Sequence, residues 1–261
     1  MRRIIITVLV LAMLSVIFTG CSSKYEGTLV VGVMDNYPPM GYRNASGELV
    51  GFEVDLARAV AEIMGADIEF YITSQQDMLG TLKSRDVDIL ISSVSYSEEK
   101  QKYAYIDFSI PYLQNGEVIV TTHELASTIT TLEGLSGMVV GVEAASKADK
   151  MVSEQKDVEF TLIRYESLSV CIAALKVGQM DCVICDMPAA IDIVERYPDK
   201  FVISSAKLTD EPLSIALGIG NENLQKQLND AILELRENGK LSELSIKYLG
   251  EDYTQNLDDD H

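Results

Sequence analysis

The sequence has few of the residues that bind transition metals or carry nucleophilic catalysis. It contains two histidines, His123 and His261, and each stands alone without a partner motif. Positive charge is also scarce, because 21 lysines and arginines face 40 aspartates and glutamates, for a formal net charge of −19. Such a balance disfavours nucleic acid and anionic lipid as partners, since both repel a negative surface. We therefore expect neither a histidine-based catalytic centre nor a nucleic-acid interface.

Cysteine is scarce as well. After Cys21 an odd number remains, Cys171, Cys182 and Cys185, which does not suit a disulfide framework in an exported protein. Cys182 and Cys185 have CxxC spacing, but they fall in a predicted strand, where residues three apart face opposite sides. No second cysteine pair or nearby histidine completes a metal site. We predict small core side chains here, with no metal and no cofactor.

The N-terminal apolar run, Ile4–Phe18, is too short for a comfortable membrane span and follows a basic start. This layout predicts a secretory signal over residues 1–20. Its ending, Phe-Thr-Gly-Cys, resembles a bacterial lipoprotein signal, in which Cys21 becomes the lipidated first residue and carries fatty acids such as palmitate. A polar tether, residues 21–27, would follow. The alternative is an uncleaved anchor helix. Either way the body of the protein is expected outside the cytoplasm, attached to a membrane.

One stretch carries the most chemistry. Val87–Ile91 is a short apolar run of the kind that forms a buried strand, and four serines follow between positions 92 and 97. Ser95 and Glu98 have capping-box spacing, which predicts a helix start. Hydroxyls, free helix-start amides and the cation of Lys100 together suit a carboxylate ligand. The alternative is a serine-rich surface turn with a solvated lysine.

The passage from helix to strand occurs twice. Leu82-Lys83 is followed by Asp88, and Leu175-Lys176 is followed by Asp181 at the same offset. Two occurrences are too few for a solenoid and instead predict two similar α/β lobes. The same repetition is seen in the strands that open the two halves, Val30-Val-Gly-Val33 and Val139-Val-Gly-Val142.

The repeat also predicts a binding site. Eleven residues after each leucine of the repeat stand Ser93 in the first half and Asp186 in the second. Both positions lie just past the carboxyl end of a predicted strand, where open α/β sheets bind ligands. If the two lobes face each other, a hydroxyl and a carboxylate converge on one cleft.

Around this repeat the chain alternates predicted strands and helices. Residues 52–64 carry apolar side chains at helical spacing, and Ser146 stands at the capping position of a later helix. Two apolar runs, residues 118–120 and 213–219, are the expected crossings between the two halves.

Several motifs together resemble the family 3 extracellular solute-binding proteins, the polar amino-acid receptors of ABC importers. The resemblance implies an α/β fold of two similar lobes joined by two hinge strands, the type 2 periplasmic-binding-protein architecture. It predicts lobe 1 at residues 28–112 plus 213–250, lobe 2 at 113–212 and an acidic tail at 251–261. The motifs are Gly51-Phe-Glu-Val-Asp-Leu-Ala57, Asp88 to Lys100, Asp107-Phe-Ser-Ile-Pro-Tyr112, Gly178-Gln-Met-Asp181 with Asp186, and Leu235-Arg-Glu-Asn-Gly239.

The resemblance also implies how a ligand carboxylate is bound. In this family an arginine at the position of Lys100 binds the amino-acid carboxylate, helped by hydroxyls that match Ser93 and Ser95. Lysine keeps the charge but loses the planar two-pronged grip of arginine. Lys147 either compensates for this loss or faces solvent.

The rest of the implied site recognises the ammonium group and the side chain. Asp186 matches the family aspartate that binds the α-ammonium, Tyr37 matches an aromatic that packs over the ligand, and Ser146 matches a clamp from the second lobe. Met34 stands where members that prefer basic ligands often carry an acid, and Gln75 stands where the family often has a second aromatic. These departures favour a zwitterionic ligand that is not basic.

The expected function is therefore that of a lipid-anchored, monomeric binding protein that delivers an amino acid to an ABC transporter permease outside the cytoplasm. The same scaffold resembles cyclohexadienyl and arogenate dehydratases, which need a general acid in the cleft, and Glu143 is the candidate for that role. A surface lipoprotein that senses a ligand or adheres is a further alternative.

Overall fold

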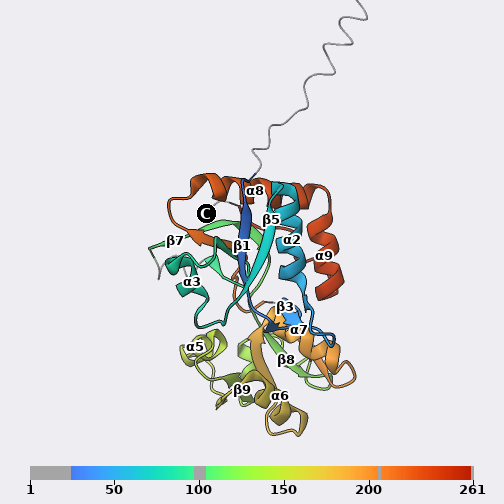
Figure 1. Ribbon diagram of the computed structural model, residues 1–261. Coiled ribbons are helices and arrows are strands. Elements are labelled where there is room, and N and C mark those ends of the chain that lie inside the picture. Colours follow the sequence, from blue (N-terminus) through green and yellow to red (C-terminus); the bar gives the residue numbers. More distant parts are fainter. Residues whose placement is uncertain (1–24, 97–103, 205–206, 260–261) are drawn as a thin grey trace, which may run out of the picture.

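The computed structural model describes residues 25–96, 104–204 and 207–259. Within these ranges the chain forms two five-stranded sheets and a smaller three-stranded sheet. The two large sheets belong to two lobes, stacked one above the other in Figure 1. The predicted class, two similar α/β lobes joined by crossing strands, is confirmed. The small sheet consists of β2 (Asn36–Tyr37), β3 (Gly41–Arg43) and β4 (Leu49–Val50).

The sheet of lobe 1 is built from both halves of the sequence. Its central strand β1 pairs in parallel with a strand on each side, and its last four residues are almost all buried, as expected for a strand covered on both faces. The fourth strand in the sheet, β13, runs antiparallel to its two neighbours. The order across the sheet is β5 (Asp67–Ile72), β1 (Thr28–Val33), β6 (Ile89–Leu90), β13 (Leu213–Gly218) and β7 (Ile106–Leu113).

The sheet of lobe 2 repeats this pattern. Its central strand β9 is parallel to both neighbours, and its fourth strand β8 is antiparallel to the strands beside it. The order is β10 (Thr161–Tyr165), β9 (Val139–Glu143), β11 (Cys182–Asp186), β8 (Glu117–Thr122) and β12 (Phe201–Ile203). Each lobe thus receives as its fourth strand the segment that has just crossed from the other lobe.

The sequence repeat corresponds to a repeated contact. The carboxylate of Asp88 accepts the backbone N–H of Val30 at 2.8 Å, and the carboxylate of Asp181 accepts that of Val139 at 2.7 Å. In each pair the aspartate N–H also donates to the carbonyl of the same valine, at 2.9 and 2.8 Å. The aspartate therefore fixes the register between two neighbouring parallel strands in both lobes.

The chain crosses between the lobes just before β8 and just before β13, whereas the expected runs, 118–120 and 213–219, lie almost entirely within those strands. The two crossings bond to each other. Gly116 lies in the first crossing, where a Cβ atom would come within 2.1 Å of the carbonyl oxygen of Thr209 in the second. The N–H of Glu117 donates to the Thr209 hydroxyl at 2.9 Å, and the N–H of Glu211 donates to the carbonyl of Asn115 at 3.0 Å. Only glycine allows this close approach of the two backbones.

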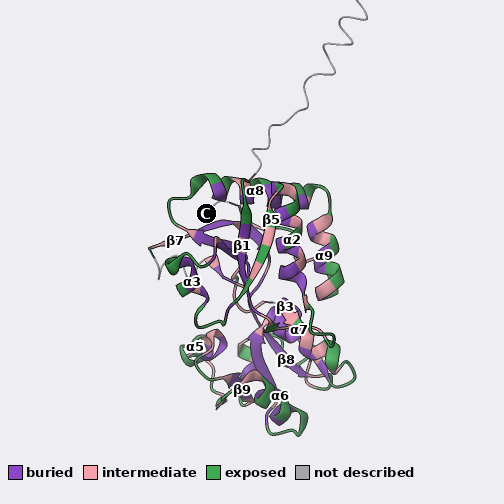
Figure 2. Ribbon diagram, in the orientation of Figure 1, coloured by how far each residue is buried: buried purple, intermediate pink, exposed green. Residues whose placement is uncertain are grey.

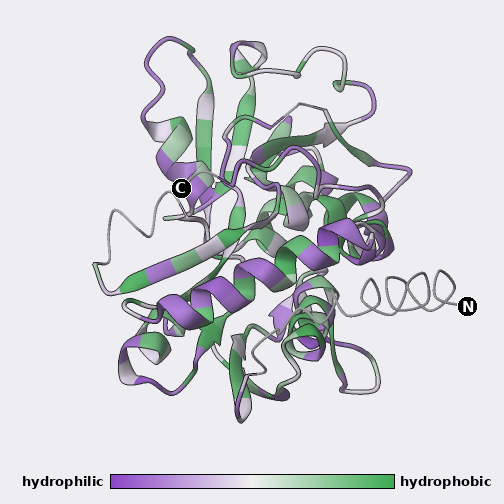
Figure 3. Ribbon diagram, turned by 90° about the horizontal axis from the view of Figure 1, so that it is seen from above, coloured by the Kyte–Doolittle hydropathy of each residue, from purple (hydrophilic) through white to green (hydrophobic). Residues whose placement is uncertain are grey.

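The helices cover the sheets with their apolar sides, so that buried residues lie along the strands and the inner helix faces (Figure 2). The strands are mainly hydrophobic and the helices carry both kinds of residue (Figure 3), as amphipathic helices over a buried sheet do. Lobe 1 has α2 (Phe52–Met64), α3 (Met78–Ser84), α8 (Glu222–Glu237) and α9 (Lys240–Leu249), and lobe 2 has the 3₁₀ turn η1 (Glu133–Leu135), α5 (Lys147–Ser153), α6 (Leu168–Lys176) and α7 (Met187–Arg196).

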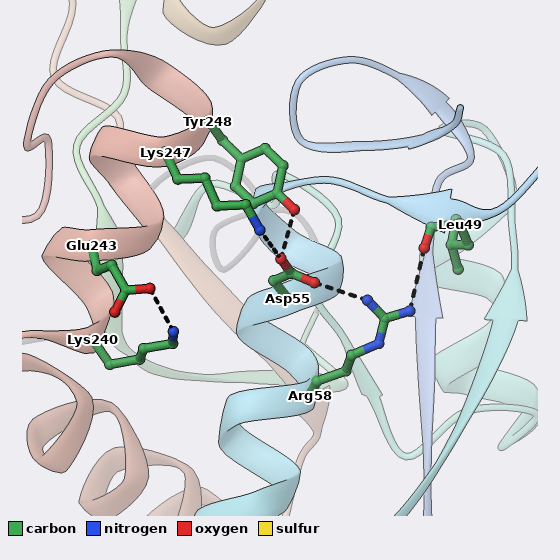
Figure 4. Close-up of polar contacts among 7 residues, drawn as sticks. All are labelled: Leu49, Asp55, Arg58, Lys240, Glu243, Lys247 and Tyr248. Atoms are coloured by element: carbon green, nitrogen blue, oxygen red, sulfur yellow. Dashed lines mark hydrogen bonds and ion pairs between the residues drawn. The ribbon is translucent and has the colours of Figure 1, made fainter. Parts of the chain in front are cut away.

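A polar network ties the C-terminal helix to lobe 1 (Figure 4). Asp55 on α2 accepts hydrogen bonds from Lys247 at 2.8 Å, from Tyr248 at 2.6 Å and from Arg58 at 2.8 Å. Burial alone would raise the pKa of Asp55, but the hydrogen bonds from Lys247 and Tyr248 hold it below its ordinary value. This aspartate of the Gly51–Ala57 motif thus has a structural role, because it attaches α9 to α2.

Part of the predicted organisation lies outside the described residues: Cys21, most of the tether and the signal segment, and the helix expected after Ser95. No helix of the described ranges is long and apolar enough to cross a membrane. The division of the chain at residues 112 and 212 and the acidic tail remain predictions. The three cysteines after Cys21 are buried and form no disulfide.

Candidate functional site

A cavity of about 400 Å³ lies between the two lobes. Its walls come from the ends of strands in both sheets and from the first crossing, which is the position that open α/β sheets use for ligands. Carboxylate, amide, hydroxyl and ammonium side chains line it together with methionines. Lobe 1 contributes Met34, Tyr37, Gln75, Gln76, Met78, Ser92 and Ser93, the crossing contributes Asn115 and Glu117, and lobe 2 contributes residues 143–148, Leu168, Ile184, Cys185 and Asp186.

Asp186 is placed by the junction of β11 and α7. It occupies the N-cap position of the helix, with Pro188 in the first turn, yet its side chain makes no capping hydrogen bond. Instead its carboxylate accepts a hydrogen bond from the Tyr37 hydroxyl of lobe 1. Burial raises the pKa of Asp186, and the bond from Tyr37 and the charge of Lys147 offset part of that rise. A part-buried carboxylate of this kind is suited to a cationic ligand group.

Tyr37 joins the two lobes across the cavity. It lies on β2, and 149 positions separate it from Asp186 in the sequence. Burial raises the pKa of Tyr37 well above its ordinary value, and the neighbouring carboxylate of Asp186 adds to this effect. The phenol therefore remains protonated at neutral pH and acts as a hydrogen-bond donor.

Ser93 stands just past β6 with a φ of 52°, in the left-handed region that non-glycine residues rarely adopt. Its hydroxyl and its N–H both donate to one carboxylate oxygen of Glu53, at 2.9 and 2.5 Å. The hydroxyl of Tyr112 donates to the same oxygen at 2.6 Å. Burial raises the pKa of Glu53, which is 1% exposed, and the bonds from Tyr112 and Ser93 offset part of the rise.

Glu53 is a positioning residue that the sequence analysis missed. Its signal was a carboxylate on the apolar side of an amphipathic helix, because Glu53 is buried together with Phe52, Leu56 and Val60. A buried acid among apolar residues requires hydrogen-bond donors, and here Ser93 is one of them. The acid of the Gly51–Ala57 motif therefore holds the cavity wall in shape.

Ser146 and Lys147 come from the start of α5. The Ser146 hydroxyl accepts the N–H of Asp149 at 3.1 Å, so the predicted helix cap is confirmed. The ammonium of Lys147 pairs with the carboxylate of Glu211 at 2.8 Å. Lys147 therefore lines the cavity rather than facing only solvent, and its ion pair with Glu211 connects it to the second crossing.

The structure brings most of the predicted ligand contacts to this one cavity. Met34 and Gln75 line it as expected. Ser95 is not among the described lining residues, and its backbone forms a bridge to Leu213 of β13. Its contact with the ligand stays a prediction. Lys100 lies outside the described residues, so its expected grip on a carboxylate stays a prediction.

Glu143, the acid considered for the dehydratase alternative, lines the cavity, where it accepts the N–H of Leu168 at 3.1 Å and so anchors the start of α6. The lining also contains polar residues that were not predicted, among them Asn115 and Glu117, which are both buried. An acid at the start of the apolar run 117–122 was the available signal. The described residues contain no group of His, Cys, Asp and Glu arranged to hold a metal ion.

Comparisons with known proteins agree with this geometry. The L-cystine-binding protein TcyJ of Escherichia coli (strain K12) is 33% identical over 234 residues, which cover 89% of this chain and 86% of TcyJ. The ABC transporter arginine-binding protein 1 of the same strain is 29% identical over 245 residues, covering 92% of this chain and 98% of that protein.

Solved structures share the architecture. The L-cystine solute receptor of Neisseria gonorrhoeae, in its unliganded open conformation, superposes with a TM-score of 0.75 at 25% identity and covers 88% of this chain and 96% of the receptor. A mutant of ArgBP from T. maritima gives a TM-score of 0.69 at 31% identity, with 86% and 96% covered.

The model of the bacterial extracellular solute-binding proteins, family 3, matches residues 29–251. These relatives are substrate-binding proteins and not enzymes. The chain belongs to the bacterial extracellular solute-binding proteins of family 3, and it is a binding protein rather than an enzyme.

Proposed function

We propose that this protein captures an amino acid in the cavity between its lobes and delivers it to the permease of an ABC transporter, outside the cytoplasm. The observation that carries the proposal is the carboxylate of Asp186. It lines a cavity whose volume of about 400 Å³ lies in the range of small-molecule sites, and it accepts a hydrogen bond from the Tyr37 hydroxyl of the opposite lobe. A zwitterion fits such a site because each of its charges meets an opposite charge or a donor.

In the proposed complex Asp186 binds the α-ammonium group and Tyr37 packs over the ligand. Ser146 donates to the ligand carboxylate and Lys100 supplies its counter-charge. Ser93, whose hydroxyl and N–H both donate to Glu53, shapes the wall beside them. Lys147 adds positive charge on the lobe 2 side. Because the cavity is shared by two lobes, closure around the ligand would exclude water and strengthen these contacts.

Among zwitterions, L-cystine is the first candidate. Two relatives carry cystine in their names, one identified by sequence and one by structure. Met34 supports a ligand that is not basic, because it places a thioether where an acid would otherwise attract a cationic side chain. Arginine and glutamine appear among the names of other relatives and are the next candidates.

Thermal unfolding of the full chain in mild detergent, with cystine and the twenty common amino acids added singly, tests the proposal. A ligand at about a hundred times its Kd should stabilise the protein by about 2.7 kcal/mol. Melting temperatures that no amino acid raises would contradict the proposed function.

We also propose that Cys21 carries a lipid anchor and that the protein acts as a monomer. The lipoprotein-like ending of the N-terminal segment supports the anchor. Metabolic labelling with a clickable palmitate analogue should mark the wild-type chain and leave Cys21→Ser unlabelled. Equal labelling of both chains would refute the assignment.

A further inference from the structure

Asn115 places a buried amide in the wall of the cavity. It belongs to the first crossing, lines the cavity and is 5% exposed. Its side-chain oxygen accepts no hydrogen bond from any described residue. Buried acceptors without a donor are rare in folded proteins, because leaving one unsatisfied is costly. The oxygen therefore indicates a donor that comes from outside the chain, either a ligand group or an ordered water molecule.

The sheet of lobe 2 sets Asn115 diagonally across from Asp186. In the antiparallel pairing of β8 with β11, Asp186 stands opposite Glu117. The pairing continues beyond the strand, because the N–H of Met187 donates to the carbonyl of Gly116 at 3.0 Å. Asn115 comes two residues before Glu117, so its side chain leaves an extended chain on the same side. Diagonal neighbours of this kind have Cβ atoms about 7 Å apart, a gap that one small polar group can bridge.

Backbone contacts hold Asn115 in its place. Its own carbonyl accepts the N–H of Glu211 from the second crossing at 3.0 Å. The N–H of the preceding residue, Gln114, donates to the carbonyl of Tyr253 at 2.8 Å. Because the chain is fixed at this residue and on both sides of it, the amide has a defined position beside Asp186.

The neighbouring carboxylate selects the kind of donor that suits this amide. Asp186 accepts a hydrogen bond from Tyr37, and a carboxylate has about four lone-pair sites, so it can accept further bonds. Its negative charge favours a cationic donor over a neutral one. A protonated amine carries three N–H groups, so it can donate to the carboxylate and to the amide oxygen at the same time.

We infer that Asn115 is a second acceptor for the α-ammonium group that Asp186 binds. The inference rests on the proposed function and adds a residue that recognises the ligand. In the complex one N–H of the ammonium group donates to the Asp186 carboxylate and another donates to the side-chain oxygen of Asn115. Small acids without an amino group bring no such donor, so the pair favours α-amino acids over them.

The variant Asn115→Leu tests the contact, because leucine is close to asparagine in shape and has no hydrogen-bonding side-chain atom. Calorimetry on the full chain in mild detergent measures its affinity for L-cystine, L-arginine, L-glutamine and any further amino acid that raises the melting temperature of the wild type. We expect a loss of about tenfold with each one that binds, because the α-ammonium group is common to all. Asn221→Leu, at an exposed position, is the matched control and should lose nothing.

The stability of the unliganded variant separates a ligand contact from a structural role. Removing a buried acceptor that has no donor should leave the protein at least as stable as the wild type in urea denaturation. A structural amide would instead lower stability when it is removed. If leucine does not fit and the variant does not fold, Asn115→Ala removes the same acceptor with a smaller side chain.

Nα-methyl forms of the same amino acids locate the bond on the ligand. Methylation removes one N–H from the ammonium group, and Asn115→Leu removes an acceptor of that group. Changes that act on one contact are not additive, whereas changes at independent sites are. We therefore expect the loss from methylation and the loss from Asn115→Leu to add up to less than their sum when the two are combined.

Four results would overturn the inference. Unchanged affinity in Asn115→Leu would assign the oxygen to an ordered water molecule, and a fall in unliganded stability would make the amide structural. Additive losses, or a loss with one amino acid and not with another that binds, would place the contact away from the α-ammonium group. In each case amino-acid binding by the wild type would survive. Absence of any amino-acid binding would instead remove the proposed function together with this contact.

Discussion

The two lobes share one framework of strands but present different chemistry to the cavity. In both, an aspartate of the repeat, Asp88 or Asp181, fixes a strand against the central strand through the same pair of hydrogen bonds. Five residues later the lobes diverge, with Ser93 in lobe 1 and Asp186 in lobe 2. The framework thus determines where the strands end, and the residue at that end determines what the lobe can bind.

The two residues are also supported differently. Ser93 is neutral and adopts a left-handed backbone conformation, and a buried acid on α2 holds it there. Asp186 carries the charge itself and needs a partner from the opposite lobe, the hydroxyl of Tyr37. A change at the lobe 1 support should therefore affect stability, and a change at Asp186 should affect affinity.

The largest effect on ligand affinity is expected when the carboxylate that lobe 2 presents to the cavity, that of Asp186, is removed. Asp186→Ala should weaken amino-acid binding by at least about 2 kcal/mol, close to thirtyfold, because the ligand ammonium would be buried without a counter-charge. Calorimetry with the stabilising amino acid measures the loss. Glu195→Gln, an exposed position on α7, serves as the control. Unchanged affinity in Asp186→Ala would mean that the ammonium binds elsewhere.

A substitution at the support of Ser93 in lobe 1 should lower the stability of the protein. Tyr112→Phe removes a donor from the buried carboxylate of Glu53, so the free energy of unfolding should fall by about 1.5 kcal/mol. Urea denaturation measures this change. Tyr42→Phe on β3 removes a hydroxyl that has no hydrogen bond to a described residue, and it should be neutral. If Tyr112→Phe left stability intact and only weakened binding, the proposed contrast between the lobes would be lost.

The raised pKa of Asp186 predicts a pH dependence of affinity. Burial favours the protonated acid, so in the unliganded protein Asp186 takes up a proton at a pH above 3.8, the ordinary pKa of an aspartate. A ligand ammonium binds the charged form, so affinity should fall about tenfold per pH unit once pH drops below that raised pKa. The stability of the unliganded protein should depend on pH in the opposite direction. The contribution of Asp186 to stability is present at low pH and is lost as pH rises through the folded-state pKa.

Calorimetric titrations over a pH series measure the first trend, and unfolding of the unliganded protein measures the second. Asp186→Asn should remove both contributions, because an amide does not titrate in this range. Curves of equal pH dependence in the wild type and in Asp186→Asn would assign the effect to another acid, such as Glu53.

The smallest expected effect is a difference in stability between variants at equivalent glycines of the two central strands. A Cβ at Gly32 would lie 2.4 Å from Cδ2 of Leu90, and one at Gly141 would lie 2.3 Å from the sulfur of Met180. Methionine is flexible and can move aside, whereas the branched, fully buried Leu90 cannot. Gly32→Ala should therefore destabilise the protein by about 1 kcal/mol more than Gly141→Ala does.

Thermal and urea unfolding of the two variants measure this difference. Gly80→Ala on α3 is a suitable reference, because apart from its chain neighbours and the backbone of its own helix no atom lies within 4 Å of the added methyl group, and alanine favours the helix. Equal losses in the two lobes would show that Leu90 adapts as readily as Met180.

Much of the fold could be predicted because its signals are local. The apolar period of residues 52–64 marks α2, the serine cap at Ser146 marks α5, and the repeated leucine-to-aspartate spacing marks two lobes of one kind. Parts of the site could be predicted for the same reason, since strand ends in an α/β sheet meet at one edge. Ser95 is bridged through its backbone to β13, and no local pattern encodes that bridge, so its contact with the ligand stays a prediction.

The sequence by itself determined the two lobes, their strand ends and the residue types at those ends, because each of these follows from neighbours within a few turns of chain. Tertiary structure alone decided which groups meet. It joined Tyr37 to Asp186, set Glu53 beneath Ser93 and put Glu117 opposite Asp186. These contacts link segments from different elements or lobes, and only the packing of complete sheets brings such segments within hydrogen-bonding distance.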